Sequence, residues 1–420
     1  MYKFKNKVGK IIIECMIDAS FNNEKEVMKI KGLSLHDVGG IESLVLDNLN
    51  PQMNIICGEN GVGKTNILDS IAYLFSNWSK NQIKKRYGTD FGQLTAHVIT
   101  SDTNIGSALY EVQAALQEFD PSERDSYRAD IDPRFAKQVI YLRVTRDLEY
   151  QRLKGIESDP DEKDYGTRLI EGLSSTDLKS WFIGRFYQSA AGNLEEQFKS
   201  NFETAKTLFS ELNENYAFHT VTRKNEIIVR TPMGDEIPFE YLSSGFKSSI
   251  LILMGIIKEI ELRFQSKLLR SIEYDGIILI DEIELHLHPE WQGVICNTLK
   301  KIFPNAQFFI STHSPHVVQT ALKGEVIALE RTEGVVKRRA LPESEYGYQG
   351  WTIEEILEDV MGMVDLRTQN YKAIKQQFDE ALDKNDRQSA QLAYDQLDKM
   401  LHPDYPLRTV FQMQLNSLGE

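Results

Sequence analysis

Eight residues near the start of the chain have the types and spacing of a phosphate-binding loop. Residues 58–65 read GENGVGKT, a full match to G-x-x-x-x-G-K-S/T, between a strand-like run at 53–57 and a helix-like run at 66–75. Glycine lets backbone N–H groups approach phosphate oxygens because it has no Cβ atom, and the N-terminus of the next helix adds further donors. The motif therefore predicts a nucleoside triphosphate site.

The side chains of this loop have separate expected roles. We expect Lys64 to reach the β- and γ-phosphates of ATP and Thr65 to bind Mg²⁺. The other residues expected to surround the phosphates are Asn60, Gly61, Val62, Gly63 and Asn66.

A pair of acids far along the chain supplies the groups that hydrolysis needs. Residues 277–282 read IILIDE, an apolar run typical of a buried strand that ends in two carboxylates. In a P-loop ATPase, Asp281 would complete the Mg²⁺ shell, and Glu282 would act as the general base for the attacking water. A core strand that ends in a solvated acid pair is the alternative on this motif alone.

Three further segments carry polar groups at the starts of helices or the ends of strands. YLSSGFKSS at 241–249 opens a long apolar helix with small residues, so its free N–H groups can bind the γ-phosphate of a nucleotide held by a second subunit. ELHLHPEWQ at 284–292 follows the strand and its acid pair after one residue, Ile283. FFISTHSPHVV places His313 just after a strand, where its side chain can contact the γ-phosphate.

In combination these motifs resemble those of ABC-type ATPases, and more narrowly the RecF, SMC and OLD-like branch. The branch commonly has G-x-N-G-x-G-K-S/T and D-E-x-E-x-x-L-H-P, and both patterns match within the two similar stretches, 27–77 and 238–330. The resemblance implies a dimer-facing loop at 284–288 and His313 as the switch histidine. It also implies a signature loop that acts in trans, formed by Ser243, Ser244 and Gly245.

The chain departs from the family pattern at two positions, and one further residue of the family has no assigned counterpart. Phe246 and Lys247 stand where the family more often has Gln or Glu, which affects the expected contacts of the signature loop. The glutamine of the family's Q-loop has no clear counterpart, because Gln138 precedes its strand instead of following it.

The remaining pattern predicts an α/β fold, an ABC-type P-loop ATPase domain with an antiparallel β subdomain, a helical insert and a helical C-terminal region. Strands are expected at 27–57, 93–115, 138–144, 276–281 and 307–311, hairpins at 218–231 and 325–340, an acidic loop at 157–166, and helices at 167–213, 245–265, 290–302 and from Pro315. The predicted regions are the N-terminal half of the ATPase domain (1–150), the insert (151–217), the C-terminal half (218–350) and a C-terminal assembly or partner-docking region (351–420).

The C-terminal region is helical in pattern and needs a partner surface. A helical pair at 373–382 and 389–401 carries an apolar stripe, which must be buried against the ATPase domain, another subunit or another protein. The residues of that stripe are Ile374, Phe378, Leu382, Leu392 and Leu397.

Composition limits the class of protein. A net charge of −14, 41% hydrophobic residues and three scattered cysteines suit a globular protein of the reducing cytoplasm, with no membrane segment. Two basic clusters, at 80–86 and 337–339, are either solvated surface or a groove for nucleic acid. His286 and His288 form an H-x-H pair, but the following Pro289 argues against a zinc site.

The chain also resembles the ATPase half of two-component anti-phage modules such as Septu. That resemblance implies a homodimer or higher homo-oligomer, ATP and Mg²⁺ as cofactors, and a separate HNH-type nuclease as the regulated partner. Two alternatives stay open. One is a RecF-like DNA-repair ATPase that binds DNA directly, and the other is a nucleotide-gated scaffold with negligible hydrolysis.

Overall fold

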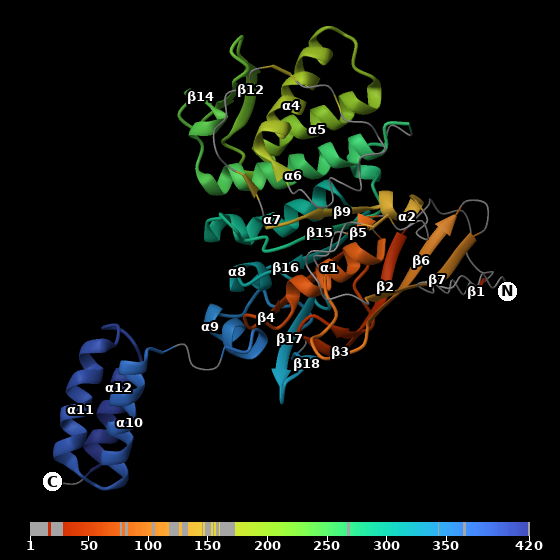
Figure 1. Cartoon of the computed structure of the whole chain (residues 1–420). Coiled ribbons are helices and arrows are strands. Elements are labelled where there is room, and N and C mark those ends of the chain that lie inside the picture. Colours follow the sequence, from red (N-terminus) through yellow and green to blue (C-terminus); the bar gives the residue numbers. More distant parts are fainter. Residues whose placement is uncertain are drawn as a thin grey trace. The chain divides into compact units, whose positions relative to one another are not determined.

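The chain forms two compact units, Met1–Gly362 and Met363–Glu420, each with its own hydrophobic core (Figure 1). Within the described residues, no helix is long and apolar enough to cross a membrane. The computed structural model describes residues 28–75, 83–102, 106–116, 133–144, 173–266, 269–342, 344–363 and 367–418, with short pieces at 16–17, 78–79, 126–127, 146–147, 153, 155–156 and 159.

A six-stranded sheet with the order β18-β17-β4-β16-β15-β9 forms the centre of the larger unit. All neighbours from β9 to β17 pair in parallel, and β18 pairs antiparallel with β17 at one edge. The strand before the P-loop and the strand before the acid pair are therefore separated by one strand, β16. The strands are β4 (Met53–Gly58), β9 (Val139–Leu142), β15 (Ile277–Ile280), β16 (Gln307–Ser311), β17 (Val326–Thr332) and β18 (Val335–Arg338).

Side chains of the central strands alternate between two hydrophobic cores, as the two-residue period of a strand requires. Ile55 and Cys57 join one core, whereas Ile56 joins the other. On β15, Ile278 and Ile280 face the first core. Every residue of β4, β9, β15 and β16 is buried, as expected for a parallel sheet that is covered on both faces.

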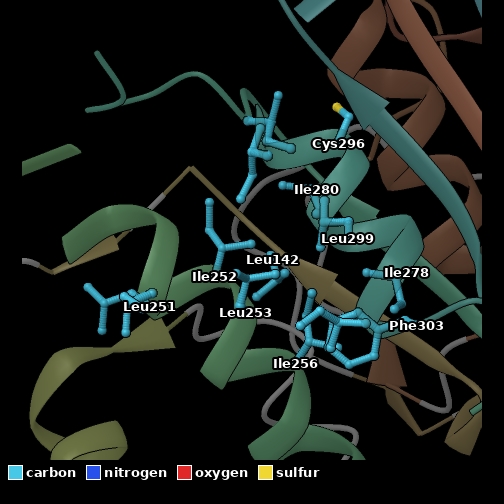
Figure 2. Packing of buried hydrophobic residues seen from close by; sticks show 14 of the residues in the cluster. Leu142, Leu251, Ile252, Leu253, Ile256, Ile278, Ile280, Cys296, Leu299 and Phe303 are labelled. Atoms are coloured by element: carbon cyan, nitrogen blue, oxygen red, sulfur yellow. The ribbon is translucent and has the colours of Figure 1, made fainter. Parts of the chain in front are cut away.

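Helices cover the first face of the central sheet (Figure 1). Figure 2 shows Ile256 of α6 and Leu299 of α7 close to Ile278 in this core. A small antiparallel sheet, β12-β13-β14, belongs to the same layer. The elements of this layer are α4 (Ser175–Ala190), α5 (Glu196–Leu212), α6 (Ser244–Arg263), α7 (Pro289–Ile302), α8 (Pro315–Gln319), β12 (Ala217–Val221), β13 (Ile227–Arg230) and β14 (Glu236–Pro238).

The helix that follows the P-loop, α1 (Lys64–Phe75), covers the second face. It shares the second core with a five-stranded antiparallel sheet of order β1-β7-β6-β2-β3. The strands of that sheet are β1 (Met16–Ile17), β2 (Met28–Val38), β3 (Ile41–Leu46), β6 (Gly92–Asp102) and β7 (Gly106–Leu116). The larger unit is thus the α/β ATPase fold with an antiparallel β subdomain that the sequence predicts.

Where the structure describes them, the predicted strands and hairpins of this unit and the helices expected from 245, at 290–302 and from Pro315 are confirmed. The region expected to be helical at 167–213 contains α4 and α5, but Leu173–Ser174 form a short strand, β11. The hairpin expected at 218–231 is the antiparallel pair β12–β13, and the one at 325–340 is β17–β18. The helix expected from 245 begins one residue earlier, at Ser244. The acidic loop predicted at 157–166 lies outside the described residues, apart from Asp159.

The smaller unit is a bundle of α10 (Gln369–Asp383), α11 (Arg387–Met400) and α12 (Leu407–Ser417). The predicted helical pair is confirmed, but the sequence did not single out the third helix, whose Phe411 and Leu415 complete the core. Leu392 is 60% exposed, so its assignment to the apolar stripe is wrong. The inner face of α11 is lined instead by Ala390, Ala393 and Leu397, and much of the predicted stripe is buried inside the unit itself.

The ATPase unit extends past the last predicted strand, to Gly362. A short helix α9 (Ile353–Glu355) and a π-helical turn η4 (Ile356–Val360) place Ile356 and Val360 in its core. Arg339 fixes this segment by donating to the carbonyl oxygens of Glu358 and Asp359.

Truncation after Gly362 is therefore expected to leave the ATPase unit folded, whereas truncation after Gly350 destabilises it. The shorter chain loses Ile356, Val360 and Met361, and each fully buried apolar side chain contributes roughly 1.5–3 kcal/mol. Thermal unfolding of the two truncated proteins and their ATP affinity check this. Equal stability of both would contradict the boundary.

Candidate nucleotide site

The predicted site residues meet at one edge of the central sheet. The carboxyl ends of β4, β16 and β15 lie side by side there, because Ile310 pairs with both Ile55 and Ile280. Ligands of open α/β sheets bind outside the carboxyl ends of the strands. The P-loop after β4, the acid pair after β15 and His313 after β16 consequently share this edge.

The shape of the P-loop depends on glycine. Gly58 has φ 139°, and a Cβ atom there would lie 2.3 Å from the carbonyl oxygen of Leu329. Gly61 has φ 75° and open space where a Cβ would be, so the loop is accessible at its tip. The next residue, Val62, is buried in the second core and anchors the loop. The result is a fixed cradle at the start of α1, where the first N–H groups of the helix have no intrahelical acceptors.

Lys64 is buried at the base of this cradle. Its Nζ donates to the carbonyl oxygens of Gly58 and Glu59, at 2.9 and 3.0 Å. Burial lowers the pKa of Lys64, and nearby acidic groups, among them Glu284 and Glu282, oppose that shift. At the start of a helix, the Lys64 ammonium can make charge-assisted hydrogen bonds to a polyanion such as a triphosphate.

Thr65 and Asp281 form a pair suited to Mg²⁺. The Thr65 hydroxyl donates to the two carboxylate oxygens of Asp281, at 3.1 and 3.2 Å. Mg²⁺ in phosphate-transfer sites takes one or two protein oxygens and completes its shell with phosphates and water. One hydroxyl and one carboxylate fit a Mg²⁺ ion whose shell is completed by the phosphates of a nucleotide. No group of three His, Cys, Asp or Glu side chains in the described part of the chain could hold a metal ion.

Ser311, at the end of β16, orients both acids of the pair. Its hydroxyl donates to Asp281 Oδ1 at 2.5 Å and accepts from the backbone N–H of Glu282 at 2.8 Å. Glu282 has φ 46°, a conformation that few residues other than glycine adopt. Its carboxylate accepts no hydrogen bond from the residues that the structure describes, which leaves it available to a water molecule.

His313 lies directly beyond β16 and is half-buried. Its backbone N–H donates to Glu284 Oε1 at 2.5 Å. Burial, followed by the Lys64 ammonium, lowers the pKa of His313, whereas Glu284 and the acid pair raise it. The imidazole is thus near Lys64 and favours its neutral form, which can either donate or accept a hydrogen bond.

The predicted signature residues lie on a different element, at the start of α6. Ser243 is the N-cap, and its hydroxyl accepts from the N–H of Phe246 at 3.3 Å. Ser243 and Ser244 are exposed, whereas Gly245 is buried so tightly that a Cβ would lie 2.9 Å from Trp291 Cδ1. The turn therefore presents two hydroxyls and free N–H groups to the surface.

The two residues that depart from the family pattern point away from that polar surface. Phe246 packs in the first core against Trp291, with ring centroids 5.1 Å apart. Lys247 donates through Nζ to the carbonyl oxygen of Glu240 at 3.0 Å. Neither replaces the side-chain amide or carboxylate that the family more often has, so the exposed contacts of this turn come from Ser243 and Ser244.

Two further residues at the site were not predicted. Arg331 donates to the carbonyl oxygens of Gly61 and Gly40, both at 3.3 Å, and so ties β17 to the tip of the P-loop. No sequence motif marks it. Arg143 follows β9 at the same edge of the sheet and pairs with Asp69 of α1 at 3.1 Å. The family's Q-loop glutamine would follow a strand at this edge, whereas Gln138 precedes β9. Among the described residues, none donates to the buried Oε1 of Gln138.

The basic clusters are engaged mainly with the protein itself. Lys85 donates to the carbonyl oxygen of Thr89, and Arg86 pairs with Glu42 at 3.0 Å. In the second cluster, Arg339 pairs with Glu330. These contacts favour the interpretation as surface charge; Lys80 lies outside the described residues.

The two histidines of the H-x-H pair are both exposed. His286 has φ 66°, and His288 caps α7 by accepting from the N–H of Glu290. These positions are those of loop residues at a helix start.

The central sheet, the glycine cradle with Lys64, and the Thr65–Asp281 pair define an ABC-type P-loop ATPase. Residues 53–319 match the family model described as an AAA domain, putative AbiEii toxin of a type IV toxin–antitoxin system. The chain is 39% identical over 399 residues to the Septu protein PtuA of Bacillus thuringiensis, covering 94% of this chain and 99% of that protein. The chain belongs to this AAA domain family and, within it, to the PtuA-like ATPases.

A more distant relative and a solved structure also match parts of the chain. The Retron Vc95 probable ATPase of Vibrio cholerae is 27% identical over 384 residues, 73% of this chain and 74% of that protein. The SMC head domain from Thermotoga maritima covers 75% of this chain and 99% of its own, with 16% identity and a TM-score of 0.41. Because that score is low, the fold assignment rests on the strand order and the family match.

Proposed function

We propose that the chain binds ATP with Mg²⁺ between two of its subunits, hydrolyses it, and thereby regulates a separate nuclease in an anti-phage defence complex. The observation that carries the ATPase part is the Thr65–Asp281 pair beside Lys64. The next residue, Glu282, has a carboxylate to which no described side chain or N–H donates. Lys64 is a cation that can bind phosphate, Thr65 and Asp281 are a pair of metal ligands, and Glu282 is a base. All of them lie at one edge of the central sheet.

Each group has a distinct part in hydrolysis. The P-loop N–H groups, Asn60 to Asn66, and Lys64 would hold the β- and γ-phosphates, and Thr65 with Asp281 would hold Mg²⁺, which neutralises charge on the phosphate oxygens. Glu282 would accept a proton from the attacking water, because none of the described residues donates to its carboxylate. His313 would donate to the γ-phosphate, whose developing charge an imidazole N–H stabilises.

The proposed dimeric arrangement of the site is inferred from the exposure of Ser243 and Ser244 to solvent. Ser243 and Ser244 present hydrogen-bond donors at a helix N-terminus, where anions bind, and they face solvent. Ser243 caps α6 and Ser244 begins it, so both belong to a different element from the P-loop and the acid pair. A second subunit that places its γ-phosphate against this turn would complete both sites symmetrically.

The regulatory part of the proposal rests on family membership. The relative from Bacillus thuringiensis is named a Septu protein. Two-component Septu-type modules pair an ATPase with an HNH-type nuclease. The second unit, Met363–Glu420, is the proposed region for assembly or partner docking, because it folds around its own core and leaves Leu392 and Met413 exposed. We place this activity in the cytoplasm.

Ser243→Arg is expected to abolish ATP-dependent dimerisation and turnover without unfolding the subunit, because an arginine would fill the space for the partner's γ-phosphate. Ser210→Arg, at an exposed serine of α5, is the matched control. Mixing Ser243→Arg with Lys64→Ala subunits would restore one composite site per heterodimer, about a quarter of wild-type turnover at equal random mixing. Full activity of Ser243→Arg alone would contradict action in trans.

A further inference from the structure

Glu284, in the segment between the acid pair and α7, is held by the switch segment on the neighbouring strand. Its Oε2 accepts from the Thr312 hydroxyl at 2.8 Å, and its Oε1 accepts from the backbone N–H of His313 at 2.5 Å. Two positions before and two positions after it, Glu282 and His286 have left-handed backbones, with φ 46° and 66°. Such conformations persist only where the surroundings hold them. Glu284 is thus an anchored point in a strained loop.

We propose that Glu284 is the positioning residue for His313, and that it couples the loop 284–288 to the γ-phosphate end of the site. This inference rests on the proposed ATPase function. Glu284 fixes the backbone of His313 directly, so a shift of the carboxylate moves the imidazole relative to Lys64. No motif of the sequence assigns Glu284 a role of this kind.

The hydrogen bonds separate the role of Glu284 from that of Glu282. A general base needs a free acceptor oxygen within reach of water. Both oxygens of Glu284 already accept from the switch segment, whereas the carboxylate of Glu282 accepts from none of the residues described. Two acids of the same type, two residues apart, therefore have different tasks.

Further side chains tie the same loop to both neighbouring segments. Gln292 donates to the carbonyl oxygen of Leu287 at 2.7 Å and accepts from the Ser314 hydroxyl at 2.6 Å. On the other side, the Ser248 hydroxyl donates to the carbonyl oxygen of Leu285 at 3.3 Å, which connects the loop to α6. The loop, the switch segment and the signature helix are thus linked by side-chain hydrogen bonds. A displacement of the loop is transmitted to His313 through Glu284.

Three substitutions at Glu284 show whether the length of its side chain or its negative charge matters for turnover. Glu284→Gln keeps the length and can accept from His313 N–H while donating to Thr312, so we expect at least about a third of wild-type kcat. Glu284→Asp keeps the charge but is one methylene shorter and cannot reach both donors. We expect Glu284→Asp and Glu284→Ala to lose at least about 10-fold in kcat, with the KM for ATP within about 3-fold. Glu290→Asp, at an exposed position of α7, is the control.

A double-mutant cycle tests whether Glu284 acts through His313. In a His313→Ala background, Glu284→Asp should change kcat by less than about 2-fold, because the group that it positions is gone. Multiplicative effects of the two substitutions would contradict the proposal. Equal loss in Glu284→Gln and Glu284→Asp would also contradict it, since charge and reach would then both be needed.

A second readout requires neither ATP nor turnover. In protein labelled with ¹⁵N-histidine, the amide of His313 is assigned by its disappearance in His313→Ala. Its hydrogen exchange should be at least about 10-fold faster in Glu284→Asp than in wild type, with Glu284→Gln in between. Unchanged exchange in Glu284→Asp overturns the contact. A wild-type protein without turnover, but with this exchange pattern, would refute the proposed ATPase function and leave the positioning contact established.

Discussion

Glu282→Gln is expected to slow ATP hydrolysis by about 10²-fold or more, the usual loss when a general base is removed. Glutamine has nearly the same size but cannot accept a proton from water. The backbone N–H of Glu282 still donates to Ser311, so the geometry of Asp281 and the left-handed turn should survive. ATP affinity should therefore change by less than about 3-fold.

Single-turnover hydrolysis with Mg²⁺ and a titration with labelled ATP measure the two quantities separately. Glu290→Gln, a substitution of the same chemistry at an exposed position in the first turn of α7, should behave as wild type. If turnover of Glu282→Gln stays within a factor of about two of wild type, the base is another residue.

Lys64→Ala is expected to abolish measurable ATP binding, a loss of at least about 10² in affinity, because charge-assisted contacts to two phosphates disappear together. The apo protein should not lose stability. Burial lowers the pKa of Lys64, so its ammonium is partly unfavourable in the folded state when no anion is bound.

Isothermal titration with ATP and thermal unfolding without nucleotide check both parts of this prediction. Lys224→Ala, at an exposed lysine between β12 and β13, is the matched control. Wild-type affinity in Lys64→Ala would refute the assignment of the P-loop, and a large fall in apo stability would contradict the electrostatic argument.

The sequence predicts the P-loop, the acid pair and their flanking elements because each depends on local physics. Continuous apolar runs such as IILI mark strands buried on both faces, and GENGVGKT has the glycines that its backbone needs. The carboxyl ends of parallel strands meet at one edge, so Lys64 and Asp281 could be expected together. Thr65, the residue after Lys64, donates a hydrogen bond to Asp281, which agrees with that expectation.

Other features depend on contacts between distant segments, which leave no periodic signal. Arg331 reaches the P-loop from β17, the strand next to β4, and Ser311 acts through hydrogen bonds that form only when β15 and β16 pair. On α11, Leu392 fits a helical stripe in the sequence but points outward, because small alanines allow closer packing on the other side. The extent of the ATPase unit to Gly362 likewise reflects burial of Ile356 and Val360 by tertiary packing.

The central claim, an ATP site completed by a second subunit, is tested most directly by the mass of the Glu282→Gln protein in solution. Light scattering after gel filtration with ATP and Mg²⁺ should show an assembly of twice the mass found with ADP, because ATP that is bound but not hydrolysed holds the two subunits together. Adding Ser243→Arg to the same chain should return the mass to the ADP value. An identical mass with ATP and ADP, at concentrations that saturate the site, would contradict the account.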